Sequence, residues 1–264
     1  MHHVEVDGLR IAYERVGDGP PLVLLHGFVA DGVTTWAPQL DVLADEFTVV
    51  AWDAPGAGRS SDPPERFGMA GYADCLARFI TQLGLERPHV AGLSFGGALA
   101  LELCRRHRTI PTTFVLVSAY AGWAGSLPPE VAEQRLTHCL ELSELSPAQY
   151  VDALLPTMFS PSTPPAVVAE FGAALREFHP VGFRAMSRAS AEDLRDALPH
   201  VDRPALLVYG DEDVRAPLEV AEDLDTALAD SMLVVLPGAG HLCNLEAPAE
   251  FNAEVRAFLH RARH

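Results

Sequence analysis

The chain has 264 residues, of which 48% are hydrophobic and 21% charged, a composition typical of a soluble globular protein with one large core. Its formal net charge of −17 argues against general binding to nucleic acid or anionic lipid, because both need a positive protein surface. The sequence contains no lysine, which excludes Schiff-base chemistry and a P-loop lysine.

The N-terminal residues show neither a basic leader followed by an apolar run nor a transit peptide, and no window is apolar for long enough to span a membrane. We therefore expect a cytoplasmic protein without a membrane partner. The cysteines are scattered and form no C-x-x-C pair, as expected of a chain whose thiols stay reduced. They are Cys75, Cys104, Cys139 and Cys243.

Short strands are predicted along most of the chain. Residues 2–7 and 9–16 are predicted to form two strands joined by the turn dipeptide Asp7-Gly8. Continuous apolar runs without alternation then predict strands that are covered on both faces, as in a parallel sheet. These runs are residues 21–27, 47–53, 88–94, 113–120, 204–210 and 231–237.

Helical patterns separate many of these strands, at residues 35–44, 69–83, 95–107, 216–229 and 247–262. The alternation predicts an α/β fold, a doubly wound and mostly parallel sheet of about eight strands. Between residues 121 and 198 helical patterns follow one another with prolines between them and no convincing strand. We therefore expect a core domain of residues 1–120 and 199–264 and a helical cap of residues 121–198, inserted after the sixth strand and lying over the carboxyl edge of the sheet.

Ser94 lies in the segment GLSFGG, where a predicted strand gives way to a predicted helix. Serine is common at helix N-caps and glycine in turns, but neither preference explains small residues both two before and two after the serine. The G-x-S-x-G arrangement is typical of a sharp turn that exposes a nucleophilic hydroxyl above the sheet. Ser94 is therefore the candidate nucleophile.

A serine hydroxyl needs a neighbouring base, usually a histidine that is itself oriented by a carboxylate. His241 follows the last predicted strand on a glycine-containing loop, at the sheet edge where Ser94 is expected. Other histidines lie on predicted helices or near the chain termini. Three acids follow the strand at 204–210, and among them Asp213 is favoured because it lies far enough along the loop to turn back over the sheet, with Asp211 in reserve.

The segments PLVLLHGF, WDAPGAGRS, GLSFGG, YGDEDVRAP and PGAGHL, in that order, resemble the α/β-hydrolase superfamily. The similarity is to its capped members, which include esterases, lactonases, carbon-carbon bond hydrolases and cofactor-free perhydrolases. It covers nearly the whole chain outside the cap. Related haloalkane dehalogenases and epoxide hydrolases use an aspartate nucleophile, so the serine at position 94 makes those activities unexpected.

The resemblance implies roles for several further residues. The backbone N–H groups of Phe28 and Phe95 are expected to form the oxyanion hole. Residues 53–60, from Asp53 to Ser60, and His26 are expected to support the site structurally.

The predicted activity is that of a serine hydrolase acting on a small to medium, largely apolar carboxylic ester or lactone through an acyl-enzyme, with no cofactor and no metal. Carbon-carbon bond hydrolysis and perhydrolysis remain alternatives with the same residues, as does, from another class, a ligand-binding receptor or non-hydrolytic cyclase. No arginine can be assigned to a substrate carboxylate from its place in the sequence, and the oligomeric state is not predicted. The expected substrate-binding residues are Phe28, Phe95, Trp123, Met158 and Phe159.

Overall fold

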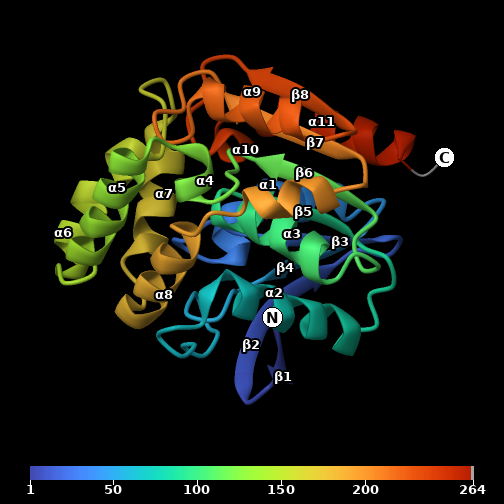
Figure 1. The fold of residues 1–264 in the computed structure, drawn as a ribbon, viewed down its shortest axis with the longest axis horizontal. Helices are drawn as coiled ribbons and strands as arrows, with labels where there is room; N and C mark the ends of the chain where they lie inside the picture. The colour runs from blue at the N-terminus through green and yellow to red at the C-terminus, as the bar shows by residue number, and fades with distance from the viewer. Residues whose placement is uncertain (263–264) are drawn as a thin grey trace.

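Eight strands form one sheet in the order β1-β2-β4-β3-β5-β6-β7-β8, in a computed structural model that describes residues 1–262 (Figure 1). The strands pair in parallel except where β2 meets β1 and β4. This arrangement confirms the predicted fold class. The strands are β1 (His2–Val6), β2 (Leu9–Val16), β3 (Pro21–Leu25), β4 (Thr48–Trp52), β5 (His89–Leu93), β6 (Thr113–Val117), β7 (Ala205–Gly210) and β8 (Ser231–Leu236).

The β1–β2 connection turns where the sequence predicted it. Asp7 and Gly8 have φ angles of 50° and 81°, the pair of positive values that a two-residue hairpin turn requires. In the centre of the sheet, every residue of β4, β5 and β6 is buried. This explains why these strands read as continuous apolar runs rather than as alternating ones.

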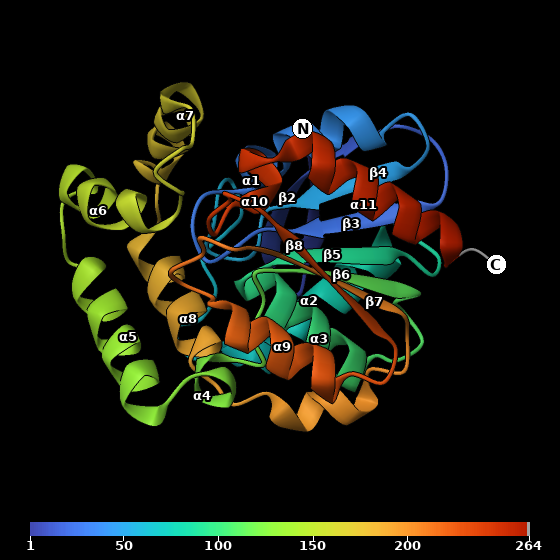
Figure 2. The same ribbon diagram turned by 90° about the horizontal axis from the view of Figure 1, so that it is seen from above.

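Helices cover both faces of the sheet. Figure 2 shows α1 (Gly32–Leu43) and α11 (Pro248–Arg261) on one face, with α3 (Phe95–Arg106) and α9 (Leu218–Ala227) on the other. α2 (Gly68–Gln82) packs beside α3, and the short α10 (Cys243–Glu246) contacts α1 and α11. The predicted core helices therefore agree with the structure to within three residues at their ends, apart from the short α10.

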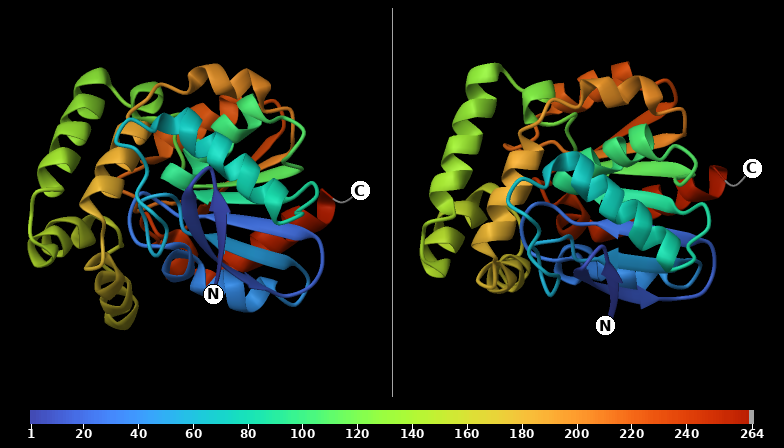
Figure 3. Two further views of the ribbon diagram at one scale, coloured as in Figure 1. Left: turned by 90° about the horizontal axis from the view of Figure 1, so that it is seen from below. Right: turned by 60° about the horizontal axis from the view of Figure 1, so that its bottom comes forward.

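The chain between β6 and β7 is helical. Its elements are α4 (Trp123–Ser126), α5 (Pro129–Leu142), α6 (Pro147–Leu154), the 3-10 turn η1 (Leu155–Thr157), α7 (Pro165–Leu175), α8 (Pro180–Ser190) and the 3-10 turn η2 (Arg195–His200). Helices α5 to α8 stand to one side of the sheet, whereas the 3-10 turn η2 packs on α3 (Figures 1 to 3). Among these, α8 contacts α2, α3 and α5, so it joins the inserted helices to the core.

Helix α8 lies within the segment predicted to be helical, although several of its residues have low helix propensity. Its residues include Gly182 and two serines, which are poor helix formers. The glycine is required by tertiary packing, because a Cβ atom at position 182 would lie 1.9 Å from the carbonyl oxygen of Gly56. The helix is thus stabilised in part by contacts with distant parts of the chain, and the helix propensity of its own residues does not include these contacts.

Candidate active site

Ser94 lies at the junction of β5 and α3 with a φ of 53° and a ψ of −107°, a conformation that L-residues rarely adopt. Two glycines allow this turn. A Cβ at position 92 would lie 2.2 Å from the carbonyl oxygen of Gly96, and a Cβ at position 96 would lie 2.3 Å from that of Leu25. The glycines of the motif are therefore needed for the strand and the helix to pass at contact distance, as the sequence indicated.

His241 and Asp213 form a hydrogen bond of 2.8 Å between Nδ1 and Oδ2, and both side chains are almost fully buried. When Nδ1 donates to the carboxylate, Nε2 is left as the proton acceptor of the imidazole. Burial alone would raise the pKa of Asp213. The charge of His241, its hydrogen bond and two backbone N–H groups outweigh burial and lower the pKa from its ordinary value.

The second oxygen of Asp213 is also held. Oδ1 accepts hydrogen bonds from the backbone N–H groups of Arg215 at 2.8 Å and Ala216 at 2.9 Å. Asp211 serves elsewhere, because its Oδ1 accepts a 2.6 Å bond from the backbone N–H of Gly238, and Glu212 is exposed. Of the three adjacent acids, the structure thus places Asp213 alone beside the imidazole of His241.

Ser94 and His241 line the same small cavity beneath the inserted helices. The cavity leaves only about 10 Å³ for a water-sized molecule, which is the room of about one water. A substrate therefore has to displace side chains in order to enter. The remaining lining residues are Gly27, Phe28, Val29, Thr35, Leu93, Met158, Phe171 and Leu242.

Two backbone donors flank the turn. Phe95 is the first residue of α3, where no intrahelical partner exists for its N–H group, and Phe28 lies in the loop after β3. Within residues 1–262, neither N–H group has a hydrogen-bond acceptor. Both groups are therefore free to bind an oxygen of a ligand, which is what an oxyanion hole requires.

His26 and Asp53 hold the loops around the cavity. Nε2 of His26 accepts a 2.9 Å bond from the N–H of Ala54, and Nδ1 donates to the carbonyl oxygen of Gly27. Burial lowers the pKa of His26, so the ring stays neutral and keeps this acceptor. Asp53 accepts bonds from the N–H groups of Gly32 and Arg59, and burial raises its pKa. Both residues have the supporting positions that the resemblance implied.

The expected substrate-binding residues are distributed unevenly. Phe28 and Met158 line the cavity with Ser94. Trp123 packs edge-on against the Phe28 ring with a centroid distance of 5.8 Å, and Phe159 packs against Phe171 at 5.5 Å. Trp123 and Phe159 therefore support the lining without belonging to it.

The side chain of Phe95 is directed away from the cavity. Its ring packs edge-on against Tyr72 of α2, with a centroid distance of 5.1 Å, and it is absent from the cavity lining. The helix turn that presents its N–H group toward the site aims its ring into the core. The expectation that the Phe95 side chain binds substrate is therefore not supported, whereas its backbone keeps the position expected of it.

Sequence reasoning missed several lining residues. Val29 lies in the loop after β3, and Thr35 lies in α1. Phe171 lies on α7, and Leu242 directly follows His241. Leu242 and Val29 adjoin assigned residues and could have been inferred from proximity. Phe171 carries no such signal, because it occupies an ordinary apolar position of an amphipathic helix.

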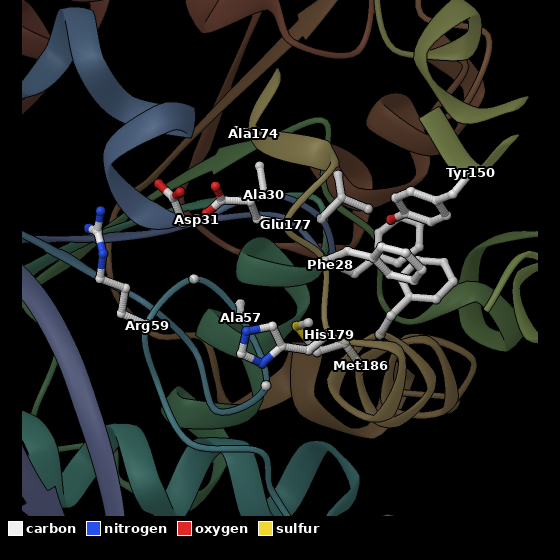
Figure 4. Close-up of a pocket in the computed structure, with 15 residues that line it drawn as sticks. Phe28, Ala30, Asp31, Ala57, Arg59, Tyr150, Ala174, Glu177, His179 and Met186 are labelled. Atoms are coloured by element: carbon white, nitrogen blue, oxygen red, sulfur yellow. The ribbon is translucent and has the colours of Figure 1, made fainter. Parts of the chain in front are cut away.

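A second hollow, of about 50 Å³, lies between the 56–59 loop and helices α7 and α8 (Figure 4). Phe28 and Val29 line both this hollow and the cavity of Ser94. Polar side chains also line the hollow, among them Asp31, Arg59 and His179 (Figure 4). The hollow therefore adjoins the cavity of Ser94 at Phe28 and Val29.

Across residues 1–262, no three His, Cys, Asp or Glu side chains are arranged to hold a metal ion. In the same range, no helix combines the length and apolar character needed to cross a membrane.

Comparisons with known proteins find similar hydrolases. The putative carbamate hydrolase RutD of Shigella flexneri serotype 5b (strain 8401) is 27% identical over 257 residues, covering 93% of each chain. A thermophilic esterase from Thermogutta terrifontis, solved with malate bound, has a TM-score of 0.91 at 29% identity and full coverage of both chains. The enol-lactonase from Burkholderia xenovorans LB400 has a TM-score of 0.88 at 26% identity, covering 98% of this chain and 99% of that one.

A family model for the alpha/beta hydrolase family matches residues 22–254, a span that runs from β3 into α11 and contains all the site residues described above. The sequence resemblance, the fold and this match lead to the same assignment. The chain belongs to the alpha/beta hydrolase family and is a hydrolase.

Proposed function

We propose that the protein is a serine hydrolase that cleaves a carboxylic ester or lactone through an acyl-enzyme intermediate. The observation that carries the proposal is the hydrogen bond between Asp213 and His241, because His241 lines the same cavity as Ser94. Esterases and an enol-lactonase among the similar structures support this substrate class.

In the first step, Oγ of Ser94 bonds to the carbonyl carbon while its proton passes to Nε2 of His241. Asp213 stabilises the imidazolium that forms. The backbone N–H groups of Phe28 and Phe95 bind the developing oxyanion, and each such donor contributes roughly 3 kcal/mol in the transition state.

The tetrahedral intermediate then collapses, the carbon–oxygen bond to the alcohol breaks, and the alcohol leaves with the proton from His241. A water molecule gives a proton to His241 and bonds to the acyl carbon, which releases the acid and restores Ser94. Every group in this cycle comes from the chain, the substrate or water.

The reacting part of the substrate is proposed to be largely apolar, because Phe28, Met158 and Phe171 form much of the cavity wall. A small acyl group suits a cavity that has to be opened by side-chain movement.

The test is Ser94→Ala, assayed on a panel of activated esters, lactones and carbamates, with the fold checked by circular dichroism and thermal unfolding. The proposal predicts that kcat falls by at least about 10³-fold, with unfolding close to that of the wild type. Undiminished turnover by a folded Ser94→Ala protein would overturn it.

A further inference from the structure

A third cavity, of about 290 Å³, lies between α5, α6 and the loop that follows β7. Residues that line it include Arg135, Cys139, Leu142, Leu154, Thr157 and Arg215. The wall is mostly apolar, yet two guanidinium groups face it. Neither group has a part in the reaction cycle proposed above.

Eight arginines among the described residues pair with a carboxylate, and Arg135 and Arg215 are not among them. Arg78, Arg105 and Arg256, for example, each pair with a carboxylate, as expected in a protein with a net charge of −17. Within residues 1–262, neither Arg135 nor Arg215 forms a salt bridge. Two cations lie together at a half-enclosed site without an anion, and such an arrangement is costly unless a ligand supplies one.

Arg135 has a structural role that leaves Arg215 as the free donor. Nη1 of Arg135 donates to the hydroxyl of Tyr120 at 2.9 Å, and Nη2 donates to the carbonyl oxygen of Arg215 at 3.0 Å. Its guanidinium also stacks over the rings of Tyr120 and Trp123. Arg135 thus fixes the backbone of Arg215 and adds positive potential.

The guanidinium of Arg215 makes one hydrogen bond, from Nη1 to Oγ1 of Thr157 at 2.9 Å. Its carbon atom lies 5.4 Å from the centre of the Phe28 ring. Asp213 is the nearby carboxylate, but His241 and two backbone N–H groups already occupy its oxygens. The remaining donors of Arg215 are therefore available.

Tyr150 supplies a second, independent observation. Its side chain is fully buried, and its hydroxyl has no hydrogen-bond partner among the residues that the structure describes. In Figure 4 this hydroxyl faces the side on which Phe28 lies. Tyr150 and Phe28 line the same hollow, and the Arg215 guanidinium lies 5.4 Å from the centre of the Phe28 ring, so Phe28 is a common neighbour of the two groups. A buried hydroxyl without a partner is costly, so its retention points to a ligand.

Arg215 and the hollow that Tyr150 lines both lie next to the cavity of Ser94. Phe28 lines the cavity of Ser94 on one side and carries the Arg215 guanidinium over its ring. Thr157 and Met158 are consecutive residues, and the first lines the arginine cavity while the second lines that of Ser94. The side chains of Phe28 and Met158 therefore separate the two cavities, and a molecule bound at Ser94 reaches Arg215 when these side chains move aside.

We propose that Arg215 and Tyr150 bind a carboxylate at the far end of the substrate, so that the preferred substrate is an ester or lactone with a free carboxylate. This inference rests on the proposed function and deepens it. A carboxylate fits because it is planar, carries one charge and presents two oxygens, which match the fork of one guanidinium and the single donor of the tyrosine.

The test compares matched substrates. One set contains 4-nitrophenyl monoesters of linear dicarboxylic acids from glutaric to suberic, with the same esters whose free acid is replaced by a primary amide. A second set carries the carboxylate or amide on the alcohol side. The wild type is expected to prefer the carboxylate over the amide in at least one set, by about 10- to 100-fold in kcat/KM after subtraction of spontaneous hydrolysis.

Variants of Arg215 and Tyr150 test whether these two side chains cause the preference for carboxylate over amide. Arg215→Met is expected to reduce the carboxylate-to-amide ratio to about one while turnover of the amide esters continues. Arg188→Met, which removes an exposed arginine of α8, keeps the wild-type ratio. Tyr150→Phe is expected to lower the ratio while raising the urea midpoint of unfolding, a combination that a purely structural tyrosine would not produce.

A wild type without carboxylate preference in either set, or an Arg215→Met protein with an unchanged ratio, overturns this inference. In both cases Ser94-dependent cleavage of the amide esters would leave the proposed function intact. If Ser94→Ala cleaves those esters as fast as the wild type, the proposed function itself fails.

Discussion

The Asp213 carboxylate accepts a 2.8 Å hydrogen bond from Nδ1 of His241 with one oxygen and two backbone N–H bonds with the other. The carboxylate is therefore fixed from both sides, and it sets both the tautomer and the orientation of the imidazole. An amide in its place would keep the volume but could donate to Nδ1, which favours the wrong tautomer.

Asp213→Asn is accordingly expected to lower kcat by about 10³- to 10⁴-fold with KM nearly unchanged. Steady-state kinetics on an activated ester measure this. Asp211→Asn is the matched control, since that side chain binds Gly238 instead of His241, and it should retain most of the activity. Equal losses in the two variants would contradict the assignment of the acid.

The burial of His26 predicts a pH dependence of stability. Its pKa in the folded protein lies below the ordinary value of 6.5, so the folded state binds fewer protons than the unfolded state. The stability that His26 contributes is therefore complete above about pH 6.5 and is lost as the pH falls through the folded pKa.

Urea unfolding between pH 5 and pH 8 measures this effect. His26→Gln, whose side-chain oxygen can still accept from the N–H of Ala54, should be less stable at pH 8 but lose less stability on acidification. A slope identical to that of the wild type would show that His26 does not titrate in this range.

The turn around Ser94 predicts a large effect at Gly96. Gly96→Ala would place a methyl group 2.3 Å from the carbonyl oxygen of Leu25, so the loss of stability should exceed about 3 kcal/mol or prevent folding. Gly84→Ala meets no atom within 4 Å but has a φ of 64°, so it should cost only about 1 to 2 kcal/mol. Denaturant unfolding of both variants compares these costs, and equal values would contradict the packing argument.

The small catalytic cavity predicts a change in chain-length preference. Met158→Ala removes a lining side chain and should shift the optimum of an acyl-ester series toward longer chains, while lowering stability by about 2 to 5 kcal/mol. Phe159→Ala changes the adjacent residue, which packs on Phe171 without lining the cavity. Kinetics across the series should show the same optimum for Phe159→Ala as for the wild type, and a shift in both variants would mean that the cap as a whole sets the length.

The parts of the molecule that the sequence predicted are those encoded by local patterns. Continuous apolar runs identified the buried strands, and the glycines beside Ser94 identified the turn because the clash they avoid lies within a few residues or on a neighbouring strand. His241 and Asp213 could be selected because the carboxyl ends of parallel strands meet at one edge of the sheet.

The features that the sequence did not predict depend on contacts between distant segments. Gly182 of α8 is required only because that helix packs against Gly56, and Phe171 reaches the cavity only through the placement of α7. Arg135 and Arg215 are eighty residues apart in the sequence, and the residues around each of them do not indicate that it lacks a carboxylate partner. The ring of Phe95 turns into the core because the helix that presents its N–H group also fixes its side chain.

The central claim is that Ser94 is the nucleophile. The most direct measurement is peptide mapping by mass spectrometry after treatment with a phosphonate that reacts with activated serines. The account predicts one adduct per chain, on Ser94, with activity lost in proportion to labelling. An adduct on any other residue, or full activity with Ser94 modified, would contradict it.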